Sequence, residues 1–257
     1  MLIEPMCTVV ILRRPEHPWP IIMGANRDEM LSRPWTPPGR HWSDRADVVA
    51  GRDDLAGGTW MGLNDSGLAA CILNRHGSLG PAPGKRSRGE LVLEALDHAD
   101  ARASAKALAD INPEAYRPFN LVITDNTEAW WLSLTADAEA ITAFPIPTGL
   151  SVFTAHDRND LSDLRIANYL PSFEAAQPPN PETGNWTEWR GLLGATKSQG
   201  SAINAMSFRM DNGFGTSSSS LLALPSVETA HGPDKIRPVW LFAPGPPESS
   251  KFTPVDI

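Results

Sequence analysis

Short apolar runs separated by turn residues dominate the first half of the chain and predict β-strands. They cover residues 7–12, 21–25, 59–63 and 67–73. Three prolines within residues 13–20 indicate a loop between the first two strands, and Asn64-Asp65-Ser66-Gly67 is typical of a tight turn between the other two. The pattern therefore predicts two hairpins in an antiparallel sheet.

Helical patterns follow a loop at residues 77–86 that is rich in glycine, proline and basic residues. Ser87 and Glu90 have the spacing of a capping box, which predicts a helix over residues 88–96 with Leu91, Ala95 and Leu96 facing inward. Alanine and leucine predict a second helix over residues 101–111. Two more are expected over 163–176, interrupted near Pro171, and over 186–195.

The remaining apolar runs predict further strands, at residues 120–124, 129–134, 140–144, 150–153, 214–224 and 238–242. This order of strands and helices favours an α+β layered fold. Neither a repeat nor a linker of distinct composition interrupts the chain, so we expect one domain over residues 1–257. Residues 1–5 then form an N-terminal extension, and the prolines after Ala243 predict a loose tail over residues 244–257.

Composition narrows the functional classes. The 257 residues are 41% hydrophobic and carry a net charge of -8, which disfavours a nucleic-acid partner because such binding depends on Lys and Arg. Apolar runs stay well below the ~18 residues of a membrane span, so we expect a cytoplasmic protein without a membrane span. Two cysteines cannot form a disulfide framework or a four-thiolate zinc site, and the six histidines have no metal-ligand spacing. We therefore expect no bound metal.

Cys7 is a candidate nucleophile because it follows an internal methionine, Met6. Translation from Met6 and removal of that methionine would give Cys7 a free α-amino group, with a reference pKa of about 7.7–8.0. Such an amine can act as general base for its own thiol. The alternative interpretation is a buried strand cysteine, since single cysteines are usually buried.

Four consecutive polar residues, Asn26, Arg27, Asp28 and Glu29, follow the second predicted strand. Because side chains alternate along a strand, Asn26 and Asp28 should face one way and Arg27 and Glu29 the other. The run could orient a substrate or a nucleophile, and the alternative is a solvated strand end with a local ion pair.

Other polar positions are weaker candidates. Asn74 ends a predicted strand, where its amide could donate to a developing oxyanion or simply satisfy a turn. Trp60 lies in the run Gly57–Gly62, which lacks the lysine of a phosphate loop. Tryptophans such as Trp60 pack in cores more often than they line ligands. The four serines Ser217–Ser220 could face a pocket, but a small-residue strand beneath close neighbours is the simpler interpretation.

Together these motifs resemble the NRDE family, which includes the transport and Golgi organisation protein 2 homologues. The resemblance covers residues 6 to about 245 and rests on an ordered set of motifs: Met6-Cys7, Ala25–Glu29 with Ser32-Arg33-Pro34, Gly57–Gly62, Ser87–Leu91 and Phe119-Asn120-Leu121. It implies a fold similar to the N-terminal-nucleophile hydrolases, a four-layer αββα sandwich of two antiparallel sheets.

Among such enzymes the chain looks most like the bile-salt hydrolases and penicillin V acylases. The resemblance implies that Cys7 attacks an amide carbonyl, that Arg27 and Asp28 hold the thiolate and the amine, and that Asn74 stabilises the oxyanion. Where those enzymes place a further oxyanion asparagine, this chain has Thr154-Ala155-His156. Either His156 or Asn159 could substitute for it.

The sequence departs from the pattern of these enzymes at two more places. Ser217-Ser218 stand where an arginine is expected in a late strand, and five residues precede Met6. If translation starts at Met1, the bulky Leu2 prevents ordinary methionine removal and Cys7 stays internal.

Two functional hypotheses follow. The first is a cysteine amidohydrolase that cleaves a C–N amide bond of a small molecule, with Cys7, Arg27, Asp28 and Asn74 as catalytic residues. In it, Asn26, Glu29, Trp60 and His156 contact the substrate. The second is a non-enzymatic haem or lipid binding and trafficking protein, in which haem is cargo and not a cofactor. The sequence identifies neither the substrate nor the oligomeric state.

Overall fold

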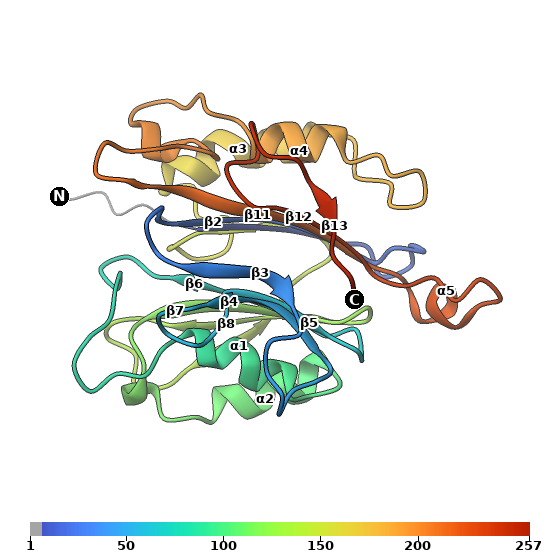
Figure 1. The fold of residues 1–257 in the computed structure, drawn as a ribbon, viewed down its shortest axis with the longest axis horizontal. Coiled ribbons are helices and arrows are strands. Elements are labelled where there is room, and N and C mark those ends of the chain that lie inside the picture. Colours follow the sequence, from blue (N-terminus) through green and yellow to red (C-terminus); the bar gives the residue numbers. More distant parts are fainter. Residues whose placement is uncertain (1–6) are drawn as a thin grey trace. The chain divides into compact units, whose positions relative to one another are not determined.

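The computed structural model describes residues 7–257, which form two compact units. Unit 1 combines the chain up to Arg33 with Thr148–Val255, and unit 2 consists of Pro34–Pro147 with Asp256–Ile257. The predicted extension over residues 1–5 and the start site at Met6 lie outside the described residues. Each unit is built around one antiparallel sheet with helices on one face (Figure 1).

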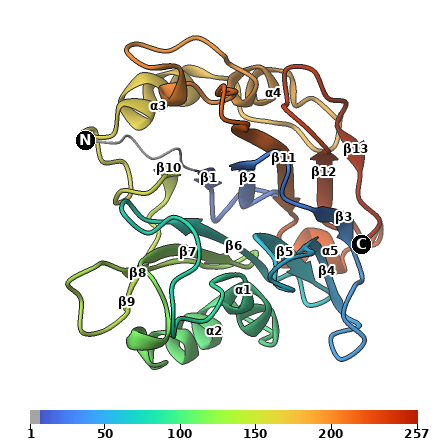
Figure 2. The same ribbon diagram turned by 60° about the vertical axis from the view of Figure 1, so that its left-hand side comes forward.

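Unit 1 contains a six-stranded sheet in the order β10-β1-β2-β11-β12-β13 (Figure 2). The strands are β1 (Thr8–Arg13), β2 (Ile21–Met30), β10 (Gly149–Phe153), β11 (Phe214–Leu224), β12 (Val239–Ala243) and β13 (Thr253–Pro254). The helices of this unit are α3 (Leu164–Ala175), α4 (Thr187–Leu193) and α5 (Val227–His231), with a 3-10 turn at Ala202–Asn204. Helices α3 and α4 pack on one face of the sheet, α3 against β10 and α4 against β2.

The core of unit 1 joins alternate residues of these strands to the two helices. Val10, Ile22 and Leu221 face Ile166 of α3 and Trp189 of α4, and all five side chains are buried. Strand β11 is buried along its whole length between β2 and β12. A buried central strand of this kind fixes the register of its neighbours, because a one-residue slip would turn apolar side chains to the wrong face.

Unit 2 contains a seven-stranded sheet in sequential order, β3 to β9. Its strands are β3 (Trp35–Gly39), β4 (Val48–Asp53), β5 (Met61–Asn64), β6 (Ala69–Asn74), β7 (Phe119–Thr124), β8 (Ala129–Leu134) and β9 (Thr142–Pro145). Helices α1 (Gly89–Leu96) and α2 (Ala101–Ala109) cover one face, and a 3-10 turn occupies Pro113–Ala115. Leu91, Ala95 and Leu96 of α1 are buried in this core as predicted.

Two glycines allow α1 to begin against the loop that leads into β5. The backbone N–H of Thr59 donates to the carbonyl of Gly89 at 3.1 Å. A Cβ on Gly58 would lie 2.6 Å from the carbonyl carbon of Gly89, closer than two non-bonded carbons can approach. The run Gly57–Gly62 thus has a structural use, which is the close contact of two backbones.

The predicted hairpins are confirmed. Strands β1 and β2 pair across the proline-containing loop, and β5 and β6 pair across the turn that Asn64 begins. The Asn64 side chain accepts hydrogen bonds from the N–H groups of Ser66 and Leu68, and Gly67 has a positive φ of 83°. Local turn chemistry was therefore sufficient to predict these connections.

Several boundaries differ from the prediction. Strand β2 continues through the polar run to Met30, because β11 pairs with it along that whole length. Strands β3 and β4 were not predicted, since the prolines of β3 mask it and only an edge strand tolerates them. Helix α3 passes through Pro171 without interruption.

The caps and the C-terminal segment also differ. Glu90 does not complete a capping box at α1, because Arg86 binds its carboxylate and the Ser87 hydroxyl accepts from the Gly89 N–H. The segment expected as a loose tail carries β13, and Phe252 beside it is buried. Across residues 7–257, every helix is too short or too polar to cross a membrane.

Candidate active site

The pairing of β1 with β2 brings Cys7 beside the polar end of β2. Thr8 lies opposite Asn26 in the ladder, and Cys7 precedes Thr8. The backbone N–H of Asp28 donates to Cys7 Sγ at 3.4 Å, and the thiol reaches the carbonyl oxygen of Asp28 at 3.6 Å. The thiol is partly buried. The strand register therefore places Cys7 next to Asp28, although the two residues are 21 positions apart in the sequence.

The polar run of β2 sends its side chains to alternate faces, as predicted. The Asn26 amide donates to the carbonyls of Leu193 and Met206 on the helix-covered face. Arg27 and Glu29 share the other face, where their charged groups are 3.8 Å apart. Glu29 also lies 3.6 Å from Arg33. Asn26 is therefore committed to anchoring α4, and its predicted contact with substrate gains no support from this geometry.

The carboxylate of Asp28 is held on the helix-covered face by a buried network. One oxygen pairs with Arg165 at 2.8 Å, and the other accepts from the Thr216 hydroxyl at 2.8 Å. Arg165 also donates to Thr8 Oγ1 and to the carbonyl of Ile203. The sequence comparison implied that Asp28 holds the amine of Cys7 through its carboxylate. In the structure Asp28 meets Cys7 through its backbone, while its carboxylate fixes α3 to the sheet.

Burial dominates the electrostatics of both groups. Burial first, and then the negative charge of Asp28, raise the pKa of the Cys7 thiol to about 11, against smaller opposing effects of the Asp28 backbone hydrogen bond and of Arg27. Burial also raises the pKa of Asp28, opposed by Arg165 and Thr216. At pH 7 a thiol with a pKa near 11 is ionised in about one molecule in 10⁴. Cys7 therefore needs a general base to act as a nucleophile.

Arg27 is positioned by a β-bulge in β11. The register shifts between Thr216 and Ser218, so Ser217 is the additional residue. Ser217 Oγ accepts from Arg27 Nη1 at 3.2 Å and donates to the Arg27 carbonyl at 3.1 Å. The hydroxyl at position 217, where an arginine was expected from the resemblance, thus orients Arg27.

The loop after β10 contains both candidates for the further oxyanion donor, Asn159 and His156, and gives them different hydrogen-bond partners. Asn159 has a positive φ of 55°. Its side chain accepts from the Val152 N–H at 2.6 Å and donates to the Leu150 carbonyl at 3.3 Å, which closes the loop onto β10. His156 is half-buried, and its Nδ1 lies 3.4 Å from an Asp160 carboxylate oxygen. Asn159 is thus engaged with the backbone and His156 with Asp160, and an oxyanion role for either residue stays a prediction.

The two candidates in unit 2 occupy different surroundings. Asn74 is the last residue of β6, opposite Phe119 of β7, and is half-buried. The ring of Trp60 lies over Gly51, where a Cβ would come within 2.4 Å of it, and meets Trp35 edge to face at 5.7 Å. Trp60 therefore packs as a core tryptophan does. An oxyanion role for Asn74 and a substrate contact for Trp60 stay predictions.

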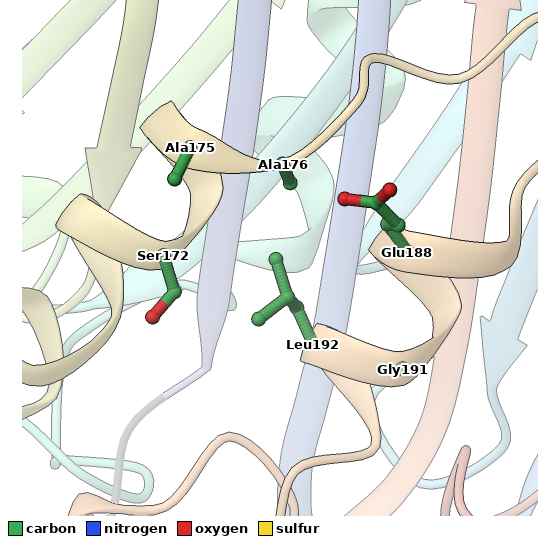
Figure 3. Close-up of a pocket in the computed structure, with 6 residues that line it drawn as sticks. All are labelled: Ser172, Ala175, Ala176, Glu188, Gly191 and Leu192. Atoms are coloured by element: carbon green, nitrogen blue, oxygen red, sulfur yellow. The ribbon is translucent and has the colours of Figure 1, made fainter.

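One cavity of unit 1, of about 310 Å³, lies between α3 and α4 (Figure 3), and its lining includes none of the predicted site residues. Its lining consists of Ser172, Ala175, Ala176, Glu188, Gly191 and Leu192. Within residues 7–257, His, Cys, Asp and Glu side chains form no group of three that could hold a metal ion.

Sequence reasoning missed Arg165 and Thr216, which fix the Asp28 carboxylate. One signal for Arg165 is present: it is an arginine in the first turn of a helix, next to the apolar stripe of Ile166, Tyr169 and Leu170. An arginine beside buried positions needs a carboxylate partner. Nothing in the sequence marks which carboxylate, since Asp28 is 137 residues away.

Comparison with known proteins agrees with the motifs. A family model described as Transport and Golgi organisation 2 matches residues 6–157. A mouse protein, Transport and Golgi organization 2 homolog, is 31% identical over 110 residues, which are 41% of this chain and 38% of that protein. The human homolog is 32% identical over 114 residues, 42% of this chain and 40% of that protein. The match thus spans less than half the length of these curated relatives.

Solved structures resemble the chain over more of its length. An N-acylethanolamine-hydrolyzing acid amidase ortholog from Caenorhabditis elegans has a TM-score of 0.58 at 13% identity, covering 84% of this chain and 92% of that chain. Penicillin V acylase from Agrobacterium tumefaciens has 0.54 at 15%, covering 98% and 86%. A variant of conjugated bile acid hydrolase from Clostridium perfringens has 0.51 at 14%, covering 98% and 97%. The predicted N-terminal-nucleophile hydrolase-like fold with two antiparallel sheets is therefore confirmed.

Proposed function

The chain belongs to the Transport and Golgi organisation 2 family, and from this premise we propose that it is a cysteine hydrolase that cleaves a C–N amide bond of a small molecule. The observation that carries the proposal is the contact of Cys7 Sγ with the backbone of Asp28, beside Arg27. The likeness in fold to amide-cleaving enzymes supports it as an analogy, because one fold can host unrelated chemistries.

The reaction requires Cys7 to become the first residue of the chain. Cleavage of the Met6–Cys7 peptide bond would free the α-amine, which takes the thiol proton as sulfur attacks the amide carbonyl. A C–S bond forms and the C–N bond breaks, and the departing nitrogen takes the proton. Water then hydrolyses the thioester, releasing the acid and restoring the thiol. The raised pKa of Cys7 is the physical reason why a base is needed.

The residues around Cys7 have roles in this proposal that follow from their contacts. Arg27 contributes a positive charge that lowers the pKa of Cys7. Asp28 acts through its backbone N–H, which donates to the sulfur. The oxyanion role of Asn74, which belongs to unit 2, and the substrate contacts of Glu29 and His156 rest on the family resemblance alone. We place the reaction in the cytoplasm, where thiols stay reduced.

Matched proteins with different N-termini test the proposal. One form starts at Met1, and the other is released by a protease so that it starts at Cys7. Both are incubated with a panel of N-acyl amides, and the released amine is measured. We expect turnover by the trimmed form, a mass shift from an acyl group on Cys7, and loss of both in Cys7→Ala. Cys71→Ala, which removes the other buried thiol, should keep them.

Turnover that survives in trimmed Cys7→Ala would contradict the proposal. A trimmed wild-type protein that forms no acyl adduct with any amide of the panel would contradict it as well. The non-enzymatic alternative, haem or lipid binding, predicts a different result: absorbance titration with haem would show a Soret shift. Such a shift, together with inactivity of the trimmed form, would favour a cargo-binding function.

A further inference from the structure

We propose that Ser217 is a positioning residue for the Cys7 nucleophile, because it holds the Arg27 guanidinium where the positive charge stabilises the thiolate. The inference rests on the proposed function, in which the Cys7 sulfur attacks an amide carbonyl. It adds a role for a serine of β11 that no step of that reaction assigns. Ser217 acts only through Arg27 and does not itself contact the substrate.

Cys7 and Arg27 belong to the same face of the sheet in unit 1. Thr8 is paired with Asn26, and both of their side chains bond to groups on the helix-covered face. The residues that adjoin this pair, Cys7 and Arg27, therefore turn to the other face. There the positive charge of Arg27 and the negative charge of Glu29 both act on the Cys7 thiol, with opposite effects on its ionisation.

The β-bulge in β11 sets two serines opposite Arg27. Thr216 pairs with Asp28 and Ser218 pairs with Arg27, so Ser217 is the additional residue between them. Both serines are buried. Ser217 forms hydrogen bonds with Arg27, whereas the Ser218 hydroxyl has no hydrogen-bond partner among the residues that the structure describes. The bulge thus places a bonded serine and a non-bonded serine side by side.

The Ser217 hydroxyl links the backbone of Arg27 to its own side chain. Ser217 Oγ donates its single proton to the Arg27 carbonyl at 3.1 Å, which leaves a lone pair to accept from Arg27 Nη1 at 3.2 Å. An arginine side chain has many rotamers, and such a contact selects among them. Because the serine is neutral, it orients the guanidinium without cancelling its charge.

Two acidic residues also act on this site. Arg27 Nη2 lies 3.8 Å from a Glu29 carboxylate oxygen, which is longer than a hydrogen bond. Asp28 meets the Cys7 sulfur through its backbone N–H, and Arg165 pairs with its carboxylate on the helix-covered face. The serine hydroxyl is therefore a closer partner of the Arg27 guanidinium than the Glu29 carboxylate is.

Alkylation with iodoacetamide, on the chain that begins at Met1, tests the inference. The Cys7 thiol loses its proton to the buffer, the sulfur forms a bond to the methylene carbon, the C–I bond breaks, and iodide leaves. Because the thiolate is the reacting species, the rate rises about tenfold per pH unit below the pKa of the thiol. Peptide mass spectrometry measures the adduct on Cys7 separately from any on Cys71. The reagent is neutral, so Arg27 does not attract it.

In Ser217→Ala we expect alkylation of Cys7 between pH 7 and 9 to be about three- to tenfold slower, because a nearby opposite charge favours the ionised thiol. The rise of the rate with pH should be displaced to higher pH by the same factor. Without the hydroxyl, the Arg27 guanidinium is no longer held in the orientation that stabilises the thiolate. Ser217→Thr keeps a hydroxyl and should restore most of the rate.

Two other serines of β11 provide matched controls. Ser219 pairs with Asn26, and its Oγ donates to the Ala25 carbonyl at 3.1 Å, which equals the distance from Ser217 Oγ to the backbone of β2. Ser219→Ala therefore removes a similar bond between the same two strands without touching Arg27. Ser218→Ala removes the hydroxyl that has no partner. Both variants should be alkylated at the wild-type rate.

Arg27→Gln separates a role through Arg27 from a general structural role. It should slow alkylation at least as much as Ser217→Ala does. Adding Ser217→Ala to Arg27→Gln should then change the rate by less than about twofold, because the two residues act as one unit. Circular dichroism checks that each variant is folded. If Arg27→Gln does not fold, the comparison of alanine with threonine at position 217 decides.

Three results would overturn the inference: a wild-type pH profile in Ser217→Ala, an equal slowing in Ser219→Ala, or an undiminished effect of Ser217→Ala in the Arg27→Gln background. Loss of rate in Ser217→Thr equal to that in Ser217→Ala would overturn it as well. Failure of the hydrolase proposal is a separate result. It would appear as a trimmed chain that cleaves no amide, while alkylation of Cys7 still depends on Ser217.

Discussion

Asp28 serves two neighbours through two different parts of the residue. Its backbone N–H contacts the Cys7 sulfur, and its carboxylate forms a buried ion pair with Arg165. The Arg165 guanidinium also lies 5.3 Å from the centre of the Phe208 ring. Removing one member of a buried pair costs far more than the pair itself contributes, because the remaining charge is left without a partner.

Asp28→Asn should therefore destabilise the protein by about 3–5 kcal/mol, since it leaves the Arg165 charge uncompensated in the interior. Urea unfolding followed by tryptophan fluorescence measures this loss. Arg102→Gln is the control, because it breaks the exposed pair of Arg102 with Glu128 and should cost less than about 1 kcal/mol. Equal losses in both variants would mean that the Asp28 carboxyl is already neutral in the folded protein.

Residue-scale chemistry was only partly predictable from sequence. The nucleophile candidate and the alternation of the polar run needed local information alone, and the alternation is confirmed. The orientation of the Asp28 carboxylate depends on Arg165 and Thr216, which lie 137 and 188 residues away. A partner at such a separation leaves no periodic signal in the chain, so sequence reasoning could not find the Arg165 contact, and a role of the Asp28 carboxylate at the Cys7 amine stays a prediction.

In unit 2, two glycines allow a helix to pack closely against a loop. The first turn of α1 lies against the loop before β5, and Gly58 and Gly89 make this contact possible. A sequence can show that glycines occur there, but it does not show whether they serve a turn, a ligand or a backbone contact. The structure assigns them to the contact.

Gly58→Ala should cost about 1–3 kcal/mol, because the added methyl group overlaps the backbone of Gly89, which cannot rotate away. Differential scanning calorimetry measures the change. Gly191→Ala in α4 is the matched control, since a Cβ there meets no atom within 4 Å. That variant should gain about 0.5–1 kcal/mol from helix propensity. If Gly58→Ala is as stable as wild type, the contact with Gly89 is not tight in solution.

Element boundaries were predictable where the pattern was local. Turn residues located the hairpins, and apolar periodicity located α1. The prediction ended β2 five residues early because its polar side chains resemble a solvated loop. Their partners are the α4 terminus, Arg165 and β11, all distant in sequence.

The chain forms two compact units, and it leaves unit 1 after Arg33 and returns to it at Thr148. Unit 1 takes residues from both ends, and unit 2 takes mainly the middle. A change of composition marks a boundary only when each domain is one continuous segment. The prediction of a single domain from a missing linker therefore used a signal that this topology would not produce, and it stays a prediction.

The C-terminal segment closes the edge of the sheet in unit 1, and Phe252→Ala tests this. Phe252 is buried, with Arg190 over its ring at 5.1 Å, so truncation should cost about 3–5 kcal/mol. Phe144→Ala removes a half-exposed ring stacked on Trp131 and should cost much less. Urea unfolding compares the two. Similar losses would indicate that the last strand contributes little to folding.

The bulge in β11 divides that strand into two halves whose side chains make different contacts. Thr216 before the bulge holds Asp28, Ser217 at the bulge holds Arg27, and beyond it Leu221 and Leu222 are wholly buried. A change at Ser217 would therefore reach Arg27 while leaving the apolar contacts of Leu221 and Leu222 in place. Under the proposed hydrolase function, this division would let substrate preference change while the central strand is retained.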